Sequence, residues 1–254
     1  MLPSLRLWRL LYRPPVSAEF RRLLRLDKLS QSASWRNSLP ALFALMVIPG
    51  VGLTMTLFIN LLCLQKARQI ATAISKHTTA GRYDVLAITP AANEGLALEI
   101  GRGYCFALTY RLRTLVKIWL GVTVGVALLF AVLGSSAPDV LRVAAAVGVL
   151  TATMFTDYVQ CVVGALAVGI LAGVVGQEAR ANVFAFALYT GFQVIFYLAF
   201  GAAIITAAVW TRGNVTPLGF GLVLLLFLII REGAILFTWQ KIRGYINEDL
   251  PALI

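Results

Sequence analysis

The chain has 254 residues, of which 59% are hydrophobic and only 13% charged, and its formal net charge is +11. A soluble domain carries about a quarter charged residues, so this chain has too little polar material to cover one soluble core. The composition therefore excludes an ordinary soluble protein and predicts an all-α fold, a polytopic transmembrane helical bundle whose outer faces are solvated by lipid.

The basic residues are distributed unevenly along the chain. Of the 22 Lys and Arg residues, eight precede Leu39, eight lie between Lys66 and Lys117, and six are scattered through the rest. An excess of Lys and Arg beside apolar segments marks the cytoplasmic side of a membrane. We therefore predict an integral protein of the bacterial cytoplasmic membrane that contacts anionic lipid headgroups and binds no nucleic acid.

Residues 1–38 form a basic amphipathic region. Arg6 and Arg9 recur at helical spacing opposite Leu7 and Leu11, and a second basic stretch follows a Pro-Pro pair. Short basic amphipathic helices of this kind lie at the headgroups of an anionic leaflet, so we expect an interfacial position. An arm that docks on a partner subunit is the alternative interpretation.

The first hydrophobic segment, residues 39–64, is interrupted at its centre by a Pro-Gly-Val-Gly run and has basic residues on both sides. It is either a broken, re-entrant hairpin or one kinked span, and the flanking charge favours the hairpin. Residues 65–114 are polar and basic, and they are predicted to form a cytoplasmic loop with helices near 65–76 and 93–115.

Residues 115–254 are predicted to complete the bundle with four further spanning units. These units are residues 115–133, 140–176, 182–210 and 217–239. The second unit is too long for one crossing at about 1.5 Å per residue. We expect it to break near Thr156-Asp157, and two crossings are the alternative, which would move the end of the chain outside. Trp210 and Trp239 suit interfacial anchors.

Three ionisable residues fall within apolar segments: Asp157, Arg231 and Glu232. A charge at the bilayer centre costs about 3 kcal/mol on insertion scales, so these side chains should face the protein interior, a cavity or an interface. One hypothesis makes Asp157 or Glu232 an ion or proton site, paired with Arg231. The structural alternative, which we favour, has Asp157 at a helix break and the other two extending to nearby headgroups.

Small residues recur every four positions after Asp157, at Ala165, Gly169 and Gly173. Small residues at this spacing let two helix backbones approach closely. They predict a tight helix contact, either within the chain or with another subunit.

Motifs for catalysis and cofactor binding are missing from the sequence. His77 is the single histidine, and the three cysteines form no CxxC pair, which argues against bis-histidine haem and a cysteine metal site. The sequence also contains no GxxxxGK[ST], HExxH or GxSxG motif. We therefore expect no cofactor, no metal site and no catalytic activity.

The polar loop contains the stretch Ala-Gly-Arg-Tyr-Asp-Val-Leu-Ala-Ile-Thr-Pro at residues 80–90. Its glycine, hydrophobic-acidic step, leucine and Thr-Pro pair resemble the cytoplasmic element of type-two ATP-binding-cassette exporter permeases. The Glu-Arg pair expected before the glycine is missing, and Lys76-His77 stands in roughly that region. The resemblance implies contact with a nucleotide-binding subunit by Gly81, Tyr83, Asp84, Leu86, Thr89 and Pro90.

The alternative interpretation of residues 80–90 is an amphipathic interfacial loop in which the glycine and the proline only end helices. Two hypotheses for function follow from the sequence. The resemblance implies an integral membrane subunit of transport type that couples to a separate ATPase. The lack of cofactor ligands and catalytic groups suggests instead a non-catalytic accessory or scaffold subunit of a larger respiratory or photosynthetic membrane complex. The two hypotheses differ in partner, which is a nucleotide-binding ATPase in the first and other membrane subunits in the second.

Overall fold

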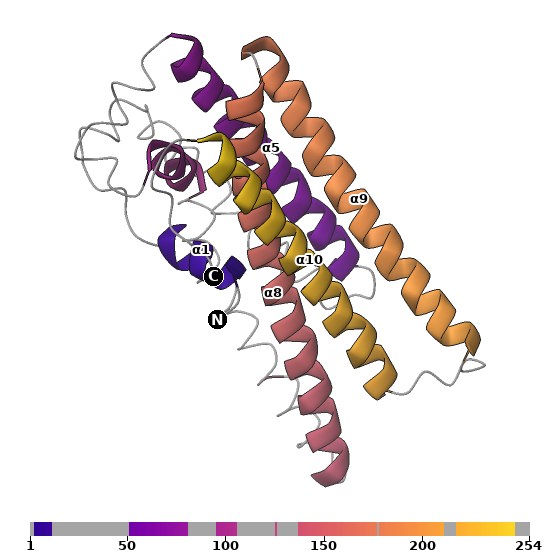
Figure 1. The fold of residues 1–254 in the computed structure, drawn as a ribbon. Helices are drawn as coiled ribbons and strands as arrows, with labels where there is room; N and C mark the ends of the chain where they lie inside the picture. The colour runs from indigo at the N-terminus through magenta and orange to yellow at the C-terminus, as the bar shows by residue number, and fades with distance from the viewer. Residues whose placement is uncertain are drawn as a thin grey trace.

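In the computed structural model, all of the regular secondary structure among the described residues is helical, as the all-α prediction required (Figure 1). It describes residues 3–11, 51–80, 95–105, 125, 137–176, 178–210 and 217–246. The helices are α1 (Pro3–Leu11), α5 (Val51–Thr79), a helix of residues 96–105, α8 (Ala137–Val175), α9 (Glu178–Trp210) and α10 (Pro217–Tyr245).

Helix α8 lies at the centre of the bundle. It packs against α5, α9, α10 and α1. Figure 1 shows the four long helices side by side, with the short helix α1 beside the middle of α8. Helix α5 runs parallel to α8, and α9 runs antiparallel to both because it follows α8 after a short turn at Gly176. Every other long helix therefore meets α8 directly.

Three helices are long and apolar enough to cross a membrane. Within the described residues, these spans are Phe155–Val175, Arg180–Trp210 and Leu222–Tyr245. The most apolar part of the α8 span is 83% buried, whereas the corresponding parts of α9 and α10 are 6% and 22% buried. Protein therefore encloses the α8 span, and the other two leave most of their apolar surface uncovered, as lipid-facing helices do.

The predicted break near Thr156-Asp157 is wrong, because α8 is one unbroken helix of 39 residues. At about 1.5 Å per residue it is about 58 Å long, which exceeds the roughly 30 Å of a hydrocarbon core. An unbroken helix also excludes two crossings within residues 140–176. The Asp157 side chain bonds to side chains of other helices and does not compete for the backbone of α8, so the helix continues through it.

Helix α5 joins the first hydrophobic segment to the predicted cytoplasmic loop. It begins at Val51, directly after the Pro-Gly pair, and continues to Thr79. The predicted boundary between residues 64 and 65 is therefore no break in structure. It is the point along one helix where apolar side chains give way to polar ones. The choice between a hairpin and a kinked span depends on residues 39–50, which lie outside the described part of the chain.

The second helix expected in the loop is present over residues 96–105, and it is buried against the bundle. It follows Gly95, whose φ of 95° lies in the region that favours glycine. Glu99 and Arg102, one turn apart, form an ion pair with both side chains 1% exposed. A polar loop segment therefore contributes to the core.

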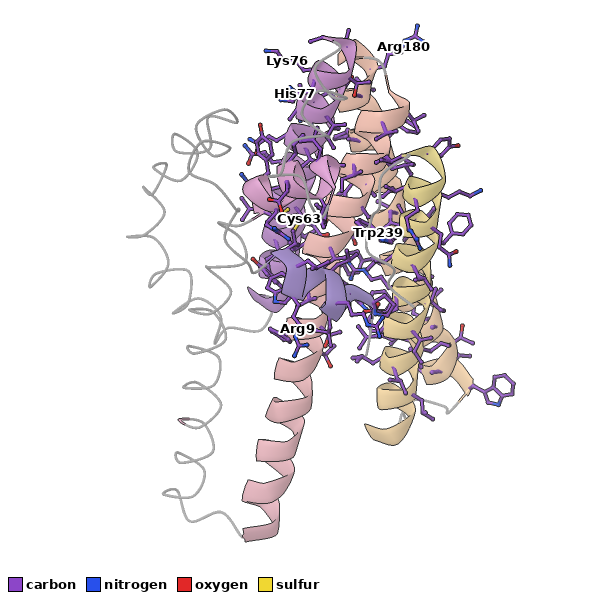
Figure 2. The ribbon with its side chains drawn as sticks, turned by 60° about the vertical axis from the view of Figure 1, so that its left-hand side comes forward. Arg9, Cys63, Lys76, His77, Arg180 and Trp239 are labelled. Carbon is purple, nitrogen blue, oxygen red and sulfur yellow. The ribbon has the colours of Figure 1, made fainter. Side chains whose placement is uncertain are left out.

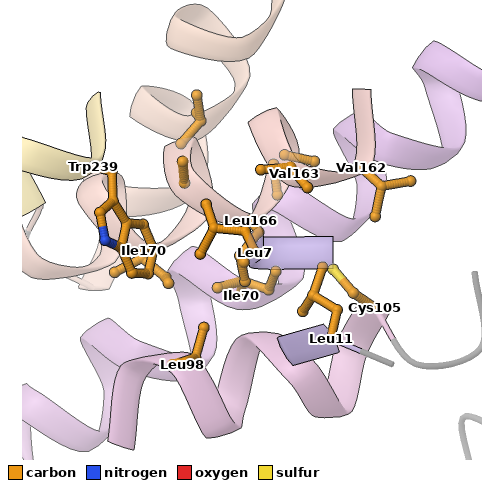
Figure 3. Packing of buried hydrophobic residues seen from close by; sticks show 14 of the residues in the cluster. Leu7, Leu11, Ile70, Leu98, Cys105, Val162, Val163, Leu166, Ile170 and Trp239 are labelled. Carbon is orange, nitrogen blue, oxygen red and sulfur yellow. The ribbon is translucent and has the colours of Figure 1, made fainter. Parts of the chain in front are cut away.

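Every described helix contributes side chains to the core cluster. The outer face of α9 takes no part in it. Leu7 of α1, Ile70 of α5, Leu166 of α8 and Trp239 of α10 are all buried in it. Figure 3 shows these residues converging. The prediction of an interfacial anchor is therefore wrong for Trp239, which is 1% exposed, whereas Trp210 at the end of α9 is 85% exposed.

Helix α1 is amphipathic, as its sequence predicts. Leu7 and Leu11 are buried against the bundle, and Arg6 and Arg9 are exposed. The apolar face of α1 is thus covered by the chain's own helices α8 and α10. The second basic helix predicted in residues 1–38 lies outside the described residues, and an interfacial position for this region stays a prediction.

Candidate functional site

The three ionisable residues of the apolar segments meet inside the bundle. Arg231 of α10 is fully buried and forms an ion pair with Asp157 of α8, whose side chain is 18% exposed. Asp157 and Arg231 are therefore paired, as one hypothesis required, and the ion or proton role that it gives them stays a prediction. The ion pair spares the buried guanidinium the cost of an isolated charge in a medium of low dielectric constant.

Arg231 is held on several sides. Its Nη1 donates to the Asp157 carboxylate, and its Nη2 donates to Gln193 Oε1 at 2.8 Å and to Cys161 Sγ at 2.9 Å. Its guanidinium carbon lies 5.8 Å from the centre of the Tyr197 ring, within the range of a cation–π interaction. Helices α8, α9 and α10 therefore all contribute to the environment of one guanidinium group.

Glu232, the neighbour of Arg231, forms a second set of bonds. Its carboxylate accepts hydrogen bonds from Ser4 N at 3.1 Å, from the Ser4 hydroxyl, and from Gln160 Nε2 at 3.2 Å. Ser4 lies in the first turn of α1, where backbone N–H groups have no partner within the helix. Glu232 therefore caps α1, and the partial positive charge of the helix N-terminus stabilises the carboxylate.

Asn60 extends the network to α5. Its Oδ1 accepts a hydrogen bond from Tyr189 at 3.3 Å, and its Nδ2 donates to Tyr197 at 3.1 Å. The Tyr197 hydroxyl in turn donates to the Asp157 carboxylate at 3.3 Å. Asp157 thus has two partners, a guanidinium from α10 and a phenol from α9. We call this set the polar network: Asn60, Asp157, Gln160, Cys161, Tyr189, Gln193, Tyr197, Arg231 and Glu232.

The polar network lies deep within the spans. Arg231 is nine residues from Leu222 and 14 from Tyr245, the two ends of its span, and Gln193 is 13 residues from Arg180. At about 1.5 Å per residue these separations are about 14 to 21 Å, close to half the thickness of a bilayer core. The interpretation that Arg231 and Glu232 extend to headgroups is therefore wrong, because both side chains are buried at this depth.

Two polar atoms of the network have no hydrogen-bond partner among the described groups. These atoms are Arg231 Nε, a donor, and Gln160 Oε1, an acceptor. A buried polar group without a partner costs about 1 to 3 kcal/mol, and natural proteins satisfy such groups with water or a ligand. The network therefore retains capacity for a polar guest.

The small-residue stripe mediates contact within the chain. A Cβ atom added at Gly169 would lie 2.9 Å from both Ala67 O and Ile70 Cβ of α5, and one added at Gly173 would lie 2.8 Å from Ile74 Cβ. The backbones of α5 and α8 therefore approach as closely as glycine permits. Ala165, the third member of the stripe, is fully buried on α8.

The residues assigned by the permease resemblance lie outside the described residues. These are Gly81, Tyr83, Asp84, Leu86, Thr89 and Pro90. The preceding helix α5 ends at Thr79, so the stretch follows directly from that end of α5. Its contact with an ATPase stays a prediction.

Sequence reasoning missed the six uncharged members of the polar network, and it also missed Ser4, which bonds to Glu232. Three of them are amides within otherwise apolar runs, Asn60, Gln160 and Gln193. An amide in a membrane span needs a partner for the same reason as a charge, although at lower cost. Attention to amides as well as charges would have found these three. Nothing local marks Cys161 or Ser4.

The described residues contain no group of three or more His, Cys, Asp or Glu side chains that could hold a metal ion. The three cysteines, Cys63, Cys105 and Cys161, are buried free thiols. Comparisons with models of protein families, with curated proteins and with solved structures found no match for this chain.

Proposed function

We propose that this chain is an integral membrane subunit of transport type, located in a bacterial cytoplasmic membrane. The observation that carries the proposal is the fully buried Arg231, paired with Asp157 and bonded to Gln193 halfway along spans that could cross a bilayer. Ionisable residues at this depth are costly, and in membrane proteins they mark pathways for ions, protons or polar solutes.

The chemistry of the network fits a site that changes partners. Asp157 bonds to Arg231 and to Tyr197, so a proton or a competing ligand at Asp157 would weaken its hold on α10 and α9 together. Arg231 Nε and Gln160 Oε1 supply an unused donor and an unused acceptor for a polar guest. Breaking and remaking these bonds would move α9 and α10 relative to α8.

Coupling to a separate ATPase would take place at residues 81–90. This stretch follows the end of α5 that carries Lys76, and Figure 2 shows Lys76, His77 and Arg180 at one end of the bundle. Basic residues favour the cytoplasmic side, where a soluble ATPase would bind. The sequence resemblance and this position together support the coupling hypothesis.

The test is gentle purification of the tagged chain from its native membranes, followed by mass spectrometry of the bound proteins. A nucleotide-binding ATPase at stoichiometric level is the expected result. Asp84→Ala and Leu86→Ala should each release it, whereas Thr78→Ala, an exposed change near the same end of α5, should not. Retention of the ATPase by both Asp84→Ala and Leu86→Ala would rule out this contact.

A second candidate function is a non-catalytic scaffold subunit of a larger membrane complex, respiratory or photosynthetic. The observation that favours it is α9, whose span is only 6% buried, with Ile195 and Leu198 more than 60% exposed. A partner helix could cover this face. The same purification would then recover redox subunits, and the double change Ile195→Ala, Leu198→Ala would reduce their recovery while changes at Asp84 would not.

A further inference from the structure

An open pocket of about 540 Å³ lies where α5, the helix of residues 96–105 and the start of α9 meet, away from the polar network. Two of the described side chains that line it are cationic and none is acidic. The lining residues that matter for a ligand are Gln65, Arg68, Gln69, Lys76, Tyr104 and Asn182. A pocket with this composition attracts an anion and offers it several N–H donors.

Arg68 is positioned for an anion by its contact with α9. Its Nε donates to Asn182 Oδ1 at 2.5 Å, which fixes the guanidinium group across the gap between α5 and α9. The outer edge of the guanidinium group, formed by its two terminal nitrogens, carries two parallel N–H groups, and such a pair binds phosphate with two parallel bonds. Gln69 Oε1 accepts from Lys66 Nζ at 3.0 Å, so the Gln69 amide N–H groups are left for a ligand.

The exposed face of α5 changes character beside this pocket. Leu57 and Leu61 are 59% and 64% exposed, and the same face continues one and two turns later with exposed Gln65 and Arg68, then Lys76. A helix face that passes from leucine to basic and amide side chains matches the passage from hydrocarbon to headgroups. The pocket therefore lies at headgroup level, with an apolar track leading away from it.

The dimensions of this track suit an acyl chain. Eleven residues separate Leu57 from Arg68, which is about 16 Å along a helix at about 1.5 Å per residue. Half of a roughly 30 Å hydrocarbon core is about 15 Å. A molecule with a phosphate at Arg68 and hydrocarbon along the two leucines would therefore reach the middle of the membrane.

We infer that the pocket between α5 and α9 binds the phosphate headgroup of an anionic phospholipid, with an acyl chain along Leu61 and Leu57. None of the described lining side chains is acidic and two are cationic, so they favour a headgroup with net negative charge over a zwitterionic one. This site is independent of the proposed transport function, since a transporter and a scaffold subunit would both be anchored by it. Figure 2 shows Lys76, one of the lining residues, at one end of the bundle.

The test is native mass spectrometry of the purified full chain in detergent, titrated with phosphatidylglycerol or with phosphatidylcholine of the same acyl chains. The first phosphatidylglycerol should bind about tenfold more tightly than phosphatidylcholine, and Arg68→Gln should remove about that factor. Lys76→Gln, which changes an exposed side chain, should also weaken the binding of phosphatidylglycerol. Arg243→Gln, an exposed change on α10, is the matched control and should leave the first site unchanged.

Glycerol phosphate, which has the headgroup chemistry without acyl chains, separates a lipid from a soluble phosphate compound. Leu61→Asn should weaken binding of phosphatidylglycerol, and glycerol phosphate should not compete with it at equal concentration. Equal affinity for the two lipids, an Arg68→Gln variant with unchanged binding, or full displacement by glycerol phosphate at equal concentration would each overturn the inference. Melting of each variant in detergent checks that the bundle is folded.

Discussion

Helix α8 is held by opposite kinds of chemistry at its two main interfaces. Toward α5 it presents Gly169 and Gly173, and the helix backbones touch with apolar side chains around them. Toward α9 and α10 it presents Asp157, which bonds to Arg231 and to a tyrosine. The first interface depends on shape and the second on the mutual neutralisation of charges.

The difference matters because lipid provides no hydrophobic driving force between helices. Close backbone contact through glycine supplies dispersion energy that is lost as soon as the helices separate. Hydrogen bonds and ion pairs, in contrast, can be exchanged between neighbouring partners without separation of the helices. The α5–α8 pair is therefore suited to stay fixed, and the α8–α9–α10 interface is suited to rearrange.

The largest effect is expected from Arg231→Met. This change leaves the partly buried Asp157 carboxylate without its guanidinium partner, and loss of one member of a buried ion pair costs about 3 to 5 kcal/mol. The free energy of unfolding in detergent, measured by titration with a denaturing surfactant, should fall by this amount. The double change Asp157→Leu, Arg231→Met removes both charges and should recover most of the loss. A double variant as unstable as the single one would show that charge pairing is not what holds this interface.

A smaller effect is expected from Gly169→Ala. The new methyl group would lie 2.9 Å from Ala67 O, so α5 and α8 must separate, and overpacking of this kind costs about 1 to 3 kcal/mol. Gly191→Ala on α9 is the matched control, because nothing lies within 4 Å of its added Cβ. Equal unfolding free energies for the two variants would contradict a tight α5–α8 contact.

Ser4→Ala tests the contact between α1 and the polar network. The change removes the hydroxyl that donates to Glu232 and leaves the backbone N–H bond of the same residue, so a loss of about 1 kcal/mol is expected. Hydrogen exchange of the α1 amides should become faster, with no change in α5. Arg9→Gln, on the exposed side of α1, should leave the exchange rates unaltered.

The last prediction concerns Cys105, which is buried in the helix of residues 96–105 and has no stability effect at neutral pH to measure. Burial raises the pKa of its thiol from 9.0 to about 12, although nearby Lys66 acts in the opposite direction. Its thiolate, the reactive form, is then about a thousandfold rarer near neutral pH than in an exposed cysteine. Maleimide labelling followed by peptide mass spectrometry should find Cys105 protected until the chain is unfolded.

The raised pKa of Cys105 also sets the sign of a pH effect on stability. The folded state keeps the thiol proton more tightly than the unfolded state, so the contribution to stability is complete below pH 9.0 and is lost as the pH rises toward about 12. Denaturant midpoints on both sides of pH 9.0 measure this loss, and Cys105→Ala should reduce it. A midpoint that rises with pH in this range would contradict the buried thiol.

The sequence was informative wherever a property is local. Apolar length predicted the spans of α9 and α10, and the four-residue spacing of Gly169 and Gly173 predicted a close helix contact. It was uninformative where partners are distant along the chain. Asp157 and Arg231 are 74 positions apart, and nothing near Asp157 distinguishes a bonded carboxylate from one that breaks a helix. Its interpretation as a break failed for this reason.

The bond between Ser4 and Glu232 joins residues 228 positions apart. Because a chain is synthesised from its N-terminus, α1 is made long before the carboxylate that caps it. The helix can reach its final position only after α10 has entered the bundle. A chain that stalls before α10 would lack the Glu232 contact and one of the two long helices that cover α1. The final position of the first described helix therefore depends on the last one, and this contact can form only in a chain that has been made as far as Glu232.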